Sequence, residues 1–417
     1  MSEPYDADVV IAGAGVAGAT LALALKSGGL EPVLVDPAPF DAQLAPSFDG
    51  RSWATAYSCF RQWRTLGLAD DLEPHAQRMD HILVTDGRSP GAATPGQTPF
   101  FLHFDAAEIA DRVAGEPLGY MLESRHVRAA VARAVLDAGI LVIAPARVVG
   151  VEFAAASGRV LLADGTSLTA PLVVGAEGRG STVRQAAGID AVGWDYPQTG
   201  VVCTVKLERP HGGVAHEYFL PGGPFAILPL TEDRASLVWT EKRDRAEALR
   251  TARPEVFQSH LHRRFGEFLG AIEVVGPVFT YPLSLSIAEK LSGPRVALLG
   301  DAAHGVHPIA GQGLNLGLKG AAALAEVLVE AARLGEDIGS ELVLDRYAAW
   351  RRFDTMTLAA GMDAFVWLFS NDHPLMRLAR GVGMSVVNRI GPARRFFMQE
   401  AGGAVGHLPR LLRGEAL

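Results

Sequence analysis

The chain has 417 residues, a length that fits two or three domains or one large domain with an inserted piece. Hydrophobic residues make up 49% and charged residues 20%, which is typical of a folded globular protein and excludes a disordered chain. The formal charge of −8, from 38 Lys and Arg against 46 Asp and Glu, argues against general nucleic-acid binding, because it provides no positive field for phosphates.

The cysteines and the apolar stretches indicate in which cellular compartment the protein is expected. Cys59 and Cys203 form no CxxC pair, so we expect reduced thiols and neither a disulfide framework nor a zinc finger. The uncharged stretch 9–25 follows acidic residues and is interrupted by glycines, so it predicts neither a signal peptide nor a membrane-spanning helix. The stretch 356–369 is too short to cross a bilayer. We therefore expect a cytoplasmic protein.

The first predicted elements are a strand, a glycine turn, a helix and a second strand. Residues 7–12 are a buried-strand run, and the turn reads Gly13-Ala14-Gly15-Val16-Ala17-Gly18. The helix extends to residue 27, and the second strand covers residues 32–36 and ends at Asp36. A GxGxxG turn in this context, with an acid at the end of the second strand, indicates a dinucleotide-binding unit.

Each glycine of this turn has a physical reason. Gly13 permits the tight turn, Gly15 lets backbone N–H groups approach a pyrophosphate, and Gly18 allows close packing of the helix. The helix N-terminus adds partial positive charge, and Asp36 can accept hydrogen bonds from a ribose diol. The turn alone does not say which dinucleotide is bound.

The regular alternation of strands and helices stops after residue 36. Prolines lead into a loop that contains Asp49-Gly50-Arg51, whereas a nicotinamide dehydrogenase would continue with regular βαβ units. Farther on we expect a helix over 54–66, a region rich in Gly, Pro, Thr and Ser over 77–104, a helix over 126–138, and short strands over 140–152 and 159–163.

Two more glycine-containing turns follow predicted strands. The strand 172–174 leads into Gly175-Ala176-Glu177-Gly178-Arg179-Gly180-Ser181, and the strand 295–300 leads into the segment 300–315. Between them, apolar runs separated by turns over residues 200–281 predict an inserted antiparallel sheet, and a long helix is expected over 311–334. In all three turns, small residues let the main chain approach a large, charged, planar ligand.

Together these turns resemble those of the FAD-dependent aromatic hydroxylases, the group that includes para-hydroxybenzoate hydroxylase. Within this group, the chain is most similar to the ubiquinone-biosynthesis ring hydroxylases. The narrower likeness rests on Asp49-Gly50-Arg51 with Ala54, on the segment 216–230, on Val238-Trp239 and on the segment 369–372. The resemblance covers nearly the whole chain.

The resemblance implies an α/β fold with a discontinuous, Rossmann-like FAD-binding domain of the glutathione-reductase type. This domain is expected to comprise residues 1–76, 103–185 and 281–370. An inserted antiparallel-sheet substrate domain would comprise residues 77–102 and 186–280, and residues 371–417 would form a helical C-terminal segment.

The resemblance also assigns cofactor-binding residues by position. Asp36 would bind the adenosine ribose, Asp301 the ribityl or pyrophosphate region, and the main chain of residues 313–315 the pyrimidine edge of the flavin. A helix N-terminus at that edge would stabilise the negative charge of the reduced flavin. The full set of residues expected to hold FAD is Gly13, Gly15, Val16, Ala17, Gly18, Asp36, Arg51, Arg125, Asp301, Gly311, Gly313, Leu314 and Asn315.

The implied reaction is a monooxygenation. NAD(P)H reduces FAD, and dioxygen supplies one oxygen atom to an electron-rich ring of a hydrophobic substrate, here a polyprenylated phenol intermediate of ubiquinone biosynthesis. The protein has to orient the ring and exclude water. Glu177 stands where these enzymes usually have Asp, which leaves the choice between NADH and NADPH open.

Two other functions remain open at this stage. One is a flavoprotein reductase or dehydrogenase that acts on a prenyl or aromatic substrate without oxygen insertion. The other is a non-catalytic scaffold of a quinone-biosynthesis complex. Retention of Asp301 and of the turn into the last helix ranks the scaffold lowest.

Two residues are candidates for contact with the substrate. Pro308 resembles the family's proline whose main chain lies beside the substrate. On the strand 216–220, alternation places His216 and Tyr218 on one face and Glu217 and Phe219 on the other, and one face should line the pocket. His216 could relay a phenolic proton, although a hydrogen-bonded histidine of the sheet is the favoured alternative.

No metal site is expected. Asp301, His304 and His307 have the residue types of metal ligands, but they lie in a turn that flavin binding already explains.

The C-terminal segment 371–417 combines seven arginines with apolar residues such as Phe396 and Phe397. This pattern equally favours a peripheral contact with anionic lipid at the inner face of a membrane and a solvated helix face or subunit contact, for instance in a biosynthetic complex.

Overall fold

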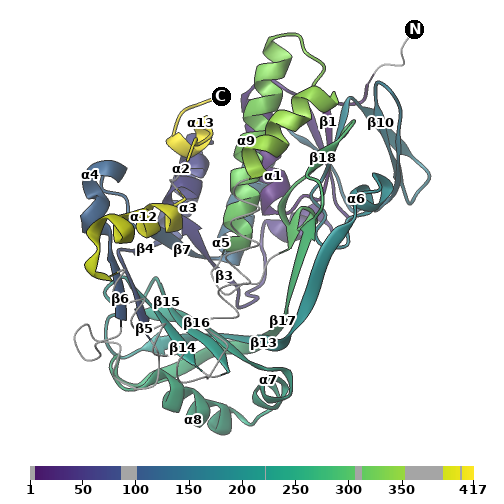
Figure 1. Ribbon diagram of the computed structural model, residues 1–417. Coiled ribbons are helices and arrows are strands. Elements are labelled where there is room, and N and C mark those ends of the chain that lie inside the picture. Colours follow the sequence, from purple (N-terminus) through teal and green to yellow (C-terminus); the bar gives the residue numbers. More distant parts are fainter. Residues whose placement is uncertain (1–4, 86–100, 221, 306–311, 353–387, 404–405) are drawn as a thin grey trace.

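The computed structural model describes residues 5–85, 101–220, 222–305, 312–352, 388–403 and 406–417. Figure 1 shows an upper body with long helices around a small sheet, and a lower sheet with helices beneath it. Two long strands, β13 (Ala191–Leu207) and β17 (Ile272–Ala288), pair with each other and run from the upper body into the lower sheet.

The sheet of the upper body has six strands in the order β18-β19-β12-β1-β2-β8. The five strands from β19 to β8 are parallel, and β18 pairs antiparallel at the edge. Every residue of β1, β2, β12 and β19 is buried, as expected for parallel strands covered on both faces. The strands are β18 Ser292–Gly293, β19 Val296–Leu298, β12 Leu172–Gly175, β1 Val9–Ala12, β2 Pro32–Val35 and β8 Leu141–Ile143.

Three helices pack together in the upper body. Helix α1 (Val16–Ser27) contacts both α5 (Ser124–Asp137) and α9 (Gln312–Arg333), and its alanines and leucines are buried in the main hydrophobic core. The sequence predicted these helices with ends that differ by one or two residues, because their apolar periodicity is a local property of the chain.

The predicted helix over 54–66 begins too early. Residues 52–56 form strand β3 (Ser52–Ala56), which pairs antiparallel with β7 (Gly119–Glu123), and only then does α2 (Tyr57–Thr65) begin. The two alanines of β3 favour a helix by propensity, but pairing with a distant strand overrides that local preference. Strand β4 (Gln77–Met79) pairs with the other side of β7 and completes this three-stranded sheet.

The lower sheet has eight strands in the order β20-β17-β13-β16-β15-β14-β5-β6. The sequence predicted the antiparallel strands of this region, but not the two helices between β16 and β17, α7 (Arg243–Arg250) and α8 (Pro254–Phe265). Both helices lie below the sheet in Figure 1. The other strands are β20 His304–Gly305, β16 Arg234–Lys242, β15 Gly223–Leu230, β14 Val214–Leu220, β5 His81–Thr85 and β6 Phe101–Asp105.

The boundaries of the inserted segment stay a proposal, which the strand pairing refines. β4 pairs with β7 and not with the lower sheet, whereas β5 pairs with β14 and β6 pairs with β5. We therefore propose that the first inserted piece begins at β5 and ends at Asp105, rather than at residues 77 and 102.

The remaining elements are short or peripheral. Strands β9 (Val148–Phe153), β10 (Gly158–Leu162) and β11 (Ser167–Ala170) form an antiparallel sheet. The short helices are α3 Ala69–Leu72, α4 Ala110–Val113 and α6 Thr182–Ala186, and the C-terminal helices are α12 Gly391–Ala401 and α13 Arg410–Arg413. Among the described helices, none combines the length and the hydropathy that crossing a bilayer requires.

Candidate functional site

The three glycine-containing turns lie at one edge of the six-stranded sheet. They follow β1, β12 and β19, which are parallel neighbours, so their carboxyl ends point the same way. Main-chain hydrogen bonds extend the ladder into the turns: Ala176 N donates to Ala12 O at 2.7 Å, and Leu299 N donates to Gly175 O at 2.9 Å. Segments far apart in sequence are therefore joined side by side along this edge of the sheet.

The glycines of the first turn have different surroundings. A Cβ on Gly13 would collide with the Ala176 carbonyl, and Gly13 also has a φ of +104°, which disfavours any other residue. A Cβ on Gly18 would collide with the Gly13 carbonyl. A Cβ on Gly15, in contrast, would meet no atom within 4 Å. Gly13 and Gly18 are thus required by the fold, whereas Gly15 borders open space, which fits a group that lies against the main chain.

Asp36 is tied to the first turn. Its carboxylate accepts hydrogen bonds from Ala14 N at 2.8 Å and from Ala38 N at 2.9 Å. Each carboxylate oxygen has a further lone pair, so these bonds leave acceptor capacity for a ribose hydroxyl. The acid therefore orders the turn as well as presenting an acceptor beside it.

The start of α9 is anchored by Asn315. Its buried side chain accepts a hydrogen bond from Ala56 N at 2.9 Å and donates one to Ala54 O at 2.8 Å. This pairing holds the first turn of α9, which includes Gly313 and Leu314, against β3. Backbone N–H groups in the first turn of a helix have no intrahelical partner, so they suit an acceptor-rich ligand edge. Gly311 and Pro308 lie outside the described residues.

An arginine that the sequence analysis missed connects the second and third turns. Arg184 of α6 is buried and donates hydrogen bonds to Arg179 O at 2.8 Å and to Ala302 O at 3.0 Å. The predicted site residue Asp301 lies beside this connection, half exposed, with a carboxylate oxygen 3.8 Å from Nε of Arg179. A basic residue in a short helix after a glycine turn is a weak signal, because most such residues are solvated.

Arg51 and Arg125 are brought to neighbouring positions. The Arg51 carbonyl accepts a hydrogen bond from Ser124 N at 2.9 Å, directly before Arg125. Each guanidinium pairs with an acid two residues away in sequence: Arg51 with Asp49 at 2.5 Å and Arg125 with Glu123 at 2.8 Å. Both arginines keep more than a third of their side-chain surface exposed, so both can contact a ligand.

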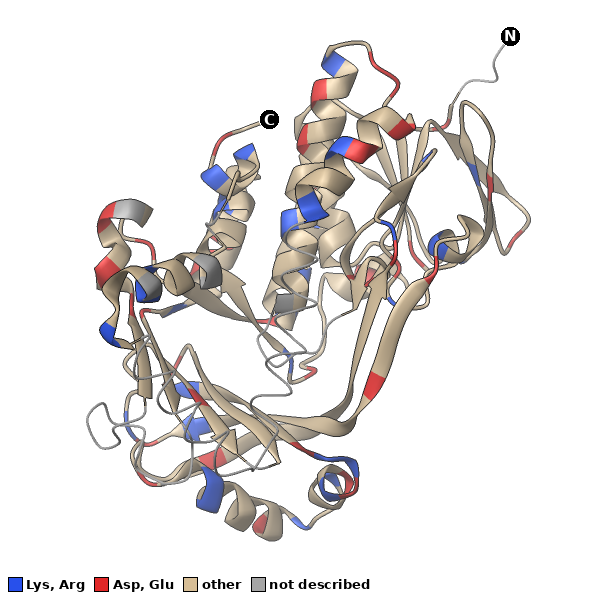
Figure 2. Ribbon diagram, viewed as in Figure 1, with Lys and Arg blue, Asp and Glu red and all other residues tan. Residues whose placement is uncertain are grey.

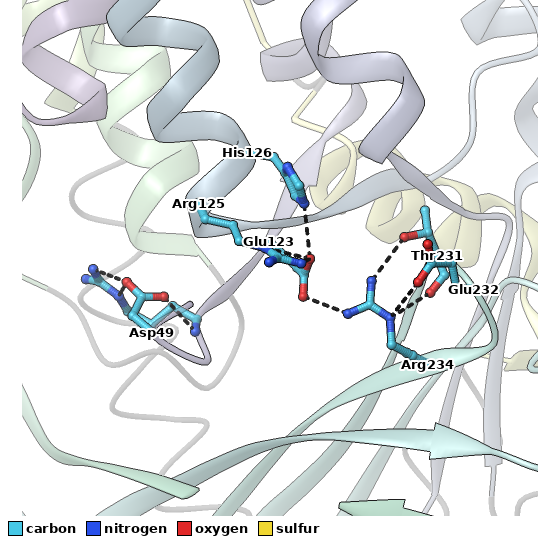
Figure 3. A network of polar contacts seen from close by, with 8 residues as sticks. Asp49, Glu123, Arg125, His126, Thr231, Glu232 and Arg234 are labelled. Atoms are coloured by element: carbon cyan, nitrogen blue, oxygen red, sulfur yellow. Dashed lines mark hydrogen bonds and ion pairs between the residues drawn. The ribbon is translucent and has the colours of Figure 1, made fainter. Parts of the chain in front are cut away.

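A charged network centred on Glu123 joins the upper body to the lower sheet (Figure 3). The buried carboxylate of Glu123, at the end of β7, pairs with Arg125 at 2.8 Å, with Arg234 of β16 at 2.9 Å and with His126 at 3.2 Å. Burial alone would raise the pKa of Glu123, but hydrogen bonds from Arg125 and Arg234 hold it below its ordinary value.

Glu123→Gln is expected to lower the free energy of unfolding by about 2 kcal/mol near neutral pH, because two arginines lose their charged partner. A lowered carboxyl pKa stabilises the fold above the pKa of the unfolded chain, about 4.3, and this stabilisation is lost as the pH falls through the folded-state pKa. Urea unfolding should therefore show a weaker acid dependence in the variant than in the wild type. The control is Glu152→Gln, which removes an exposed carboxylate 3.9 Å from Arg159. If the free energy of unfolding depended on pH equally in all three proteins, Glu123 would not stabilise the fold through its charge.

The predicted catalytic residue His216 does not face the upper body. Its ring centroid lies 5.0 Å from that of Phe268, which packs against the hydrophobic cluster formed with residues of α7 and α8. Burial lowers the pKa of His216 to about 4, so the ring is neutral at physiological pH, and its Nδ1 has no hydrogen-bond partner in the described part of the chain. A proton relay to a ligand bound between the two sheets gains no support from this placement.

The described residues also include no group of three His, Cys, Asp or Glu side chains arranged to hold a metal ion.

Comparisons with known proteins find relatives over nearly the whole chain. A family model described as "FAD binding domain" matches residues 6–358. The ubiquinone hydroxylase UbiL of Rhodospirillum rubrum is 45% identical over 416 residues, covering 99% of this chain and 94% of that protein. The 3-demethoxyubiquinol 3-hydroxylase of Escherichia coli is 33% identical over 393 residues, covering 93% of this chain and 96% of that protein.

Solved structures show the same fold. The p-nitrophenol 4-monooxygenase PnpA of Pseudomonas putida matches with a TM-score of 0.75 and 22% identity over 96% of this chain and 99% of that chain. The probable FAD-dependent monooxygenase pqsL of Pseudomonas aeruginosa matches with a TM-score of 0.72 and 25% identity over 91% of this chain and 99% of that chain.

Proposed function

Because the chain belongs to the FAD-binding-domain family that includes the ubiquinone hydroxylases, we propose that it hydroxylates the aromatic ring of a polyprenylated phenol precursor of ubiquinone. It is an FAD-dependent monooxygenase with NAD(P)H as reductant and dioxygen as co-substrate. The observation that carries the proposal is the 45% identity to a ubiquinone hydroxylase over 99% of the chain.

The residues of the three turns fit this cofactor. Open space above Gly15, a helix N-terminus at α1 and a second one at α9 suit a pyrophosphate and a flavin edge that gains negative charge on reduction. We propose that Asp36 holds the adenosine ribose and that Asp301 lies beside the ribityl or pyrophosphate part of FAD. Arg51 and Arg125 would contact the cofactor from the neighbouring elements. When bound, FAD supplies the redox chemistry that activates dioxygen, and the protein orients the ring and excludes water.

Mass analysis with labelled oxygen tests this function. The wild-type protein, loaded with FAD and supplied with NADH or NADPH, 18O2 and a phenol that carries a short prenyl chain, should form a product with one additional 18O atom. A product changed by two hydrogens without oxygen would instead identify a reductase or dehydrogenase.

Deletion of the gene should cause a quinone precursor that lacks one hydroxyl group to accumulate. A normal quinone pool in a strain without a redundant enzyme would contradict the assignment.

We further propose a peripheral membrane contact at the C-terminal helices, because a polyprenylated substrate resides in lipid. Ile390, Phe396 and Phe397, next to or within α12, are each about half exposed and lie among arginines such as Arg389 and Arg395. Apolar side chains among cations suit an anionic lipid surface. The double variant Phe396→Ser, Phe397→Ser should co-sediment less with vesicles of phosphatidylglycerol than the wild type does. Equal sedimentation of both proteins would support the solvated face or subunit contact instead.

A further inference from the structure

The two faces of the lower sheet have different partners. On one face, Phe225, Ile227 and Trp239 pack in a cluster with Phe257 and Leu261 of α8. Neighbouring residues along a strand point to opposite faces, so positions such as 226 and 238 belong to the other face. That other face is directed at the upper body, which lies above the sheet in Figure 1.

Contacts of β17 show that this other face of the sheet is turned toward the upper body. Phe279 lies against the loop that leads to Arg51, since a Cβ on Gly50 would collide with its ring. Two residues farther along the same face, Tyr281 donates a hydrogen bond from its hydroxyl to Asp49 O at 3.2 Å. Residues in the same ladder rows as Phe279 and Tyr281 therefore face the part of the molecule that we propose to hold the flavin.

A row of directly paired residues on successive strands connects Phe279 with Glu217 across the sheet. Glu217 of β14 has Val84 of β5 on one side and Ala226 of β15 on the other. From Ala226 the row continues through Val238 and Val202 to Phe279. Glu217 is the one ionisable residue in this row, and its partners are apolar.

One carboxyl oxygen of Glu217 has no hydrogen-bond partner in the part of the chain that the structure describes. This oxygen, Oε1, is shielded from solvent. Burial raises the pKa of Glu217 to about 8, and no other charged group adds to this shift. Ala215 and Phe219, its neighbours on the same face of β14, are uncharged. The raised pKa favours the protonated carboxyl at neutral pH, and this form can both donate and accept a hydrogen bond.

We propose that Glu217 orients the aromatic substrate by hydrogen bonding to its ring hydroxyl. This inference rests on the proposed function, which supplies a phenol as the substrate. A phenol both donates and accepts, as a protonated carboxyl does, and the apolar row beside Glu217 suits the ring and its prenyl chain. Glu217 as a whole is partly buried, but a shielded carboxyl oxygen without a partner is costly to fold, and a bound ligand that satisfies it offsets that cost.

The test compares binding of two ligands to three variants of the FAD-loaded protein. The ligands are a short-chain prenylated phenol and its methyl ether, which lacks the hydroxyl donor. Glu217→Leu removes the hydrogen-bonding group, Glu217→Gln keeps a donor and an acceptor but cannot ionise, and Tyr218→Phe is a matched control on the next residue, which faces the helices. Binding is followed by the change in flavin fluorescence, so this part of the test needs no turnover.

Glu217→Leu should bind the phenol about tenfold more weakly than the wild type, with the ether unaffected. It should also release more hydrogen peroxide per NAD(P)H consumed, because a loosely held ring is hydroxylated less efficiently. Glu217→Gln should retain most of the affinity, and Tyr218→Phe all of it. In the wild type, affinity for the phenol relative to the ether should rise as the pH rises through about 8, since an ionised carboxylate is a stronger acceptor for the phenolic O–H. In Glu217→Gln this rise should be absent.

Unchanged phenol affinity in Glu217→Leu, or an equal loss for the ether, would overturn the inference. Failure of the wild type to insert oxygen would instead overturn the proposed function, and the two binding series would still decide whether Glu217 recognises a ring hydroxyl.

Discussion

Gly15→Val is expected to yield a protein that folds but is isolated without FAD. A Cβ at this position meets no protein atom within 4 Å, and the backbone of Gly15 has φ −66° and ψ 173°, an extended conformation that valine adopts readily. The substitution should therefore change the stability of the FAD-free protein by no more than about 1 kcal/mol, the scale of a helix-cap effect. The added methyl groups would occupy the space that we assign to the pyrophosphate. We expect FAD affinity to fall at least about 100-fold, which corresponds to about 2.7 kcal/mol.

Titration with FAD, followed by flavin fluorescence, measures the affinity, and urea unfolding of both proteins stripped of FAD measures the stability. FAD has to be absent in the second measurement, because a bound ligand stabilises the fold by mass action. Gly13→Val is the contrasting variant: its Cβ would collide with the Ala176 carbonyl, so it should lose the fold together with the cofactor. Wild-type FAD affinity in Gly15→Val would mean that the cofactor does not lie over this turn.

Arg184→Met is expected to lower the free energy of unfolding by about 3 kcal/mol, because a buried and a partly buried carbonyl group lose a charged donor at once. These are the carbonyls of Arg179 and Ala302, in the second and third turns, so the variant should also bind FAD more weakly. Methionine keeps most of the side-chain volume, which separates loss of hydrogen bonds from loss of packing.

The matched control is Arg159→Met, an exposed arginine of β10 whose Nε donates to Ser167 at 3.1 Å. It should change stability by less than about 0.5 kcal/mol. If Arg184→Met were as stable as Arg159→Met, the two turns would not depend on this connection.

The parts of the site that the sequence predicted well are those with local signatures. Glycines directly after buried apolar strands mark the first and second turns. That these turns meet was implied by the resemblance, and the pairing of β1, β12 and β19 places them at one edge of the sheet. The long apolar helix α9 was predictable from its local apolar pattern. None of these predictions required knowledge of a distant contact.

The features that the sequence did not reveal depend on distant contacts. β3 exists because β7 pairs with it, and the role of Arg184 depends on carbonyl groups that the fold brings to it. Alternation along β14 separated His216 from Glu217, but it could not say which face meets the upper body, and that face turned out to be the one with Glu217. Helix α8 had a local signal, since Pro254 occupies a first-turn position.

The flavin content of the freshly purified protein tests the central claim most directly. If the three turns bind FAD as proposed, the isolated protein should be yellow, should release one FAD per chain on denaturation, and should regain its colour when the stripped protein is mixed with FAD. The opposite result would be a colourless protein that does not retain FAD added at micromolar concentration and does not quench its fluorescence. That result would contradict the proposed cofactor site.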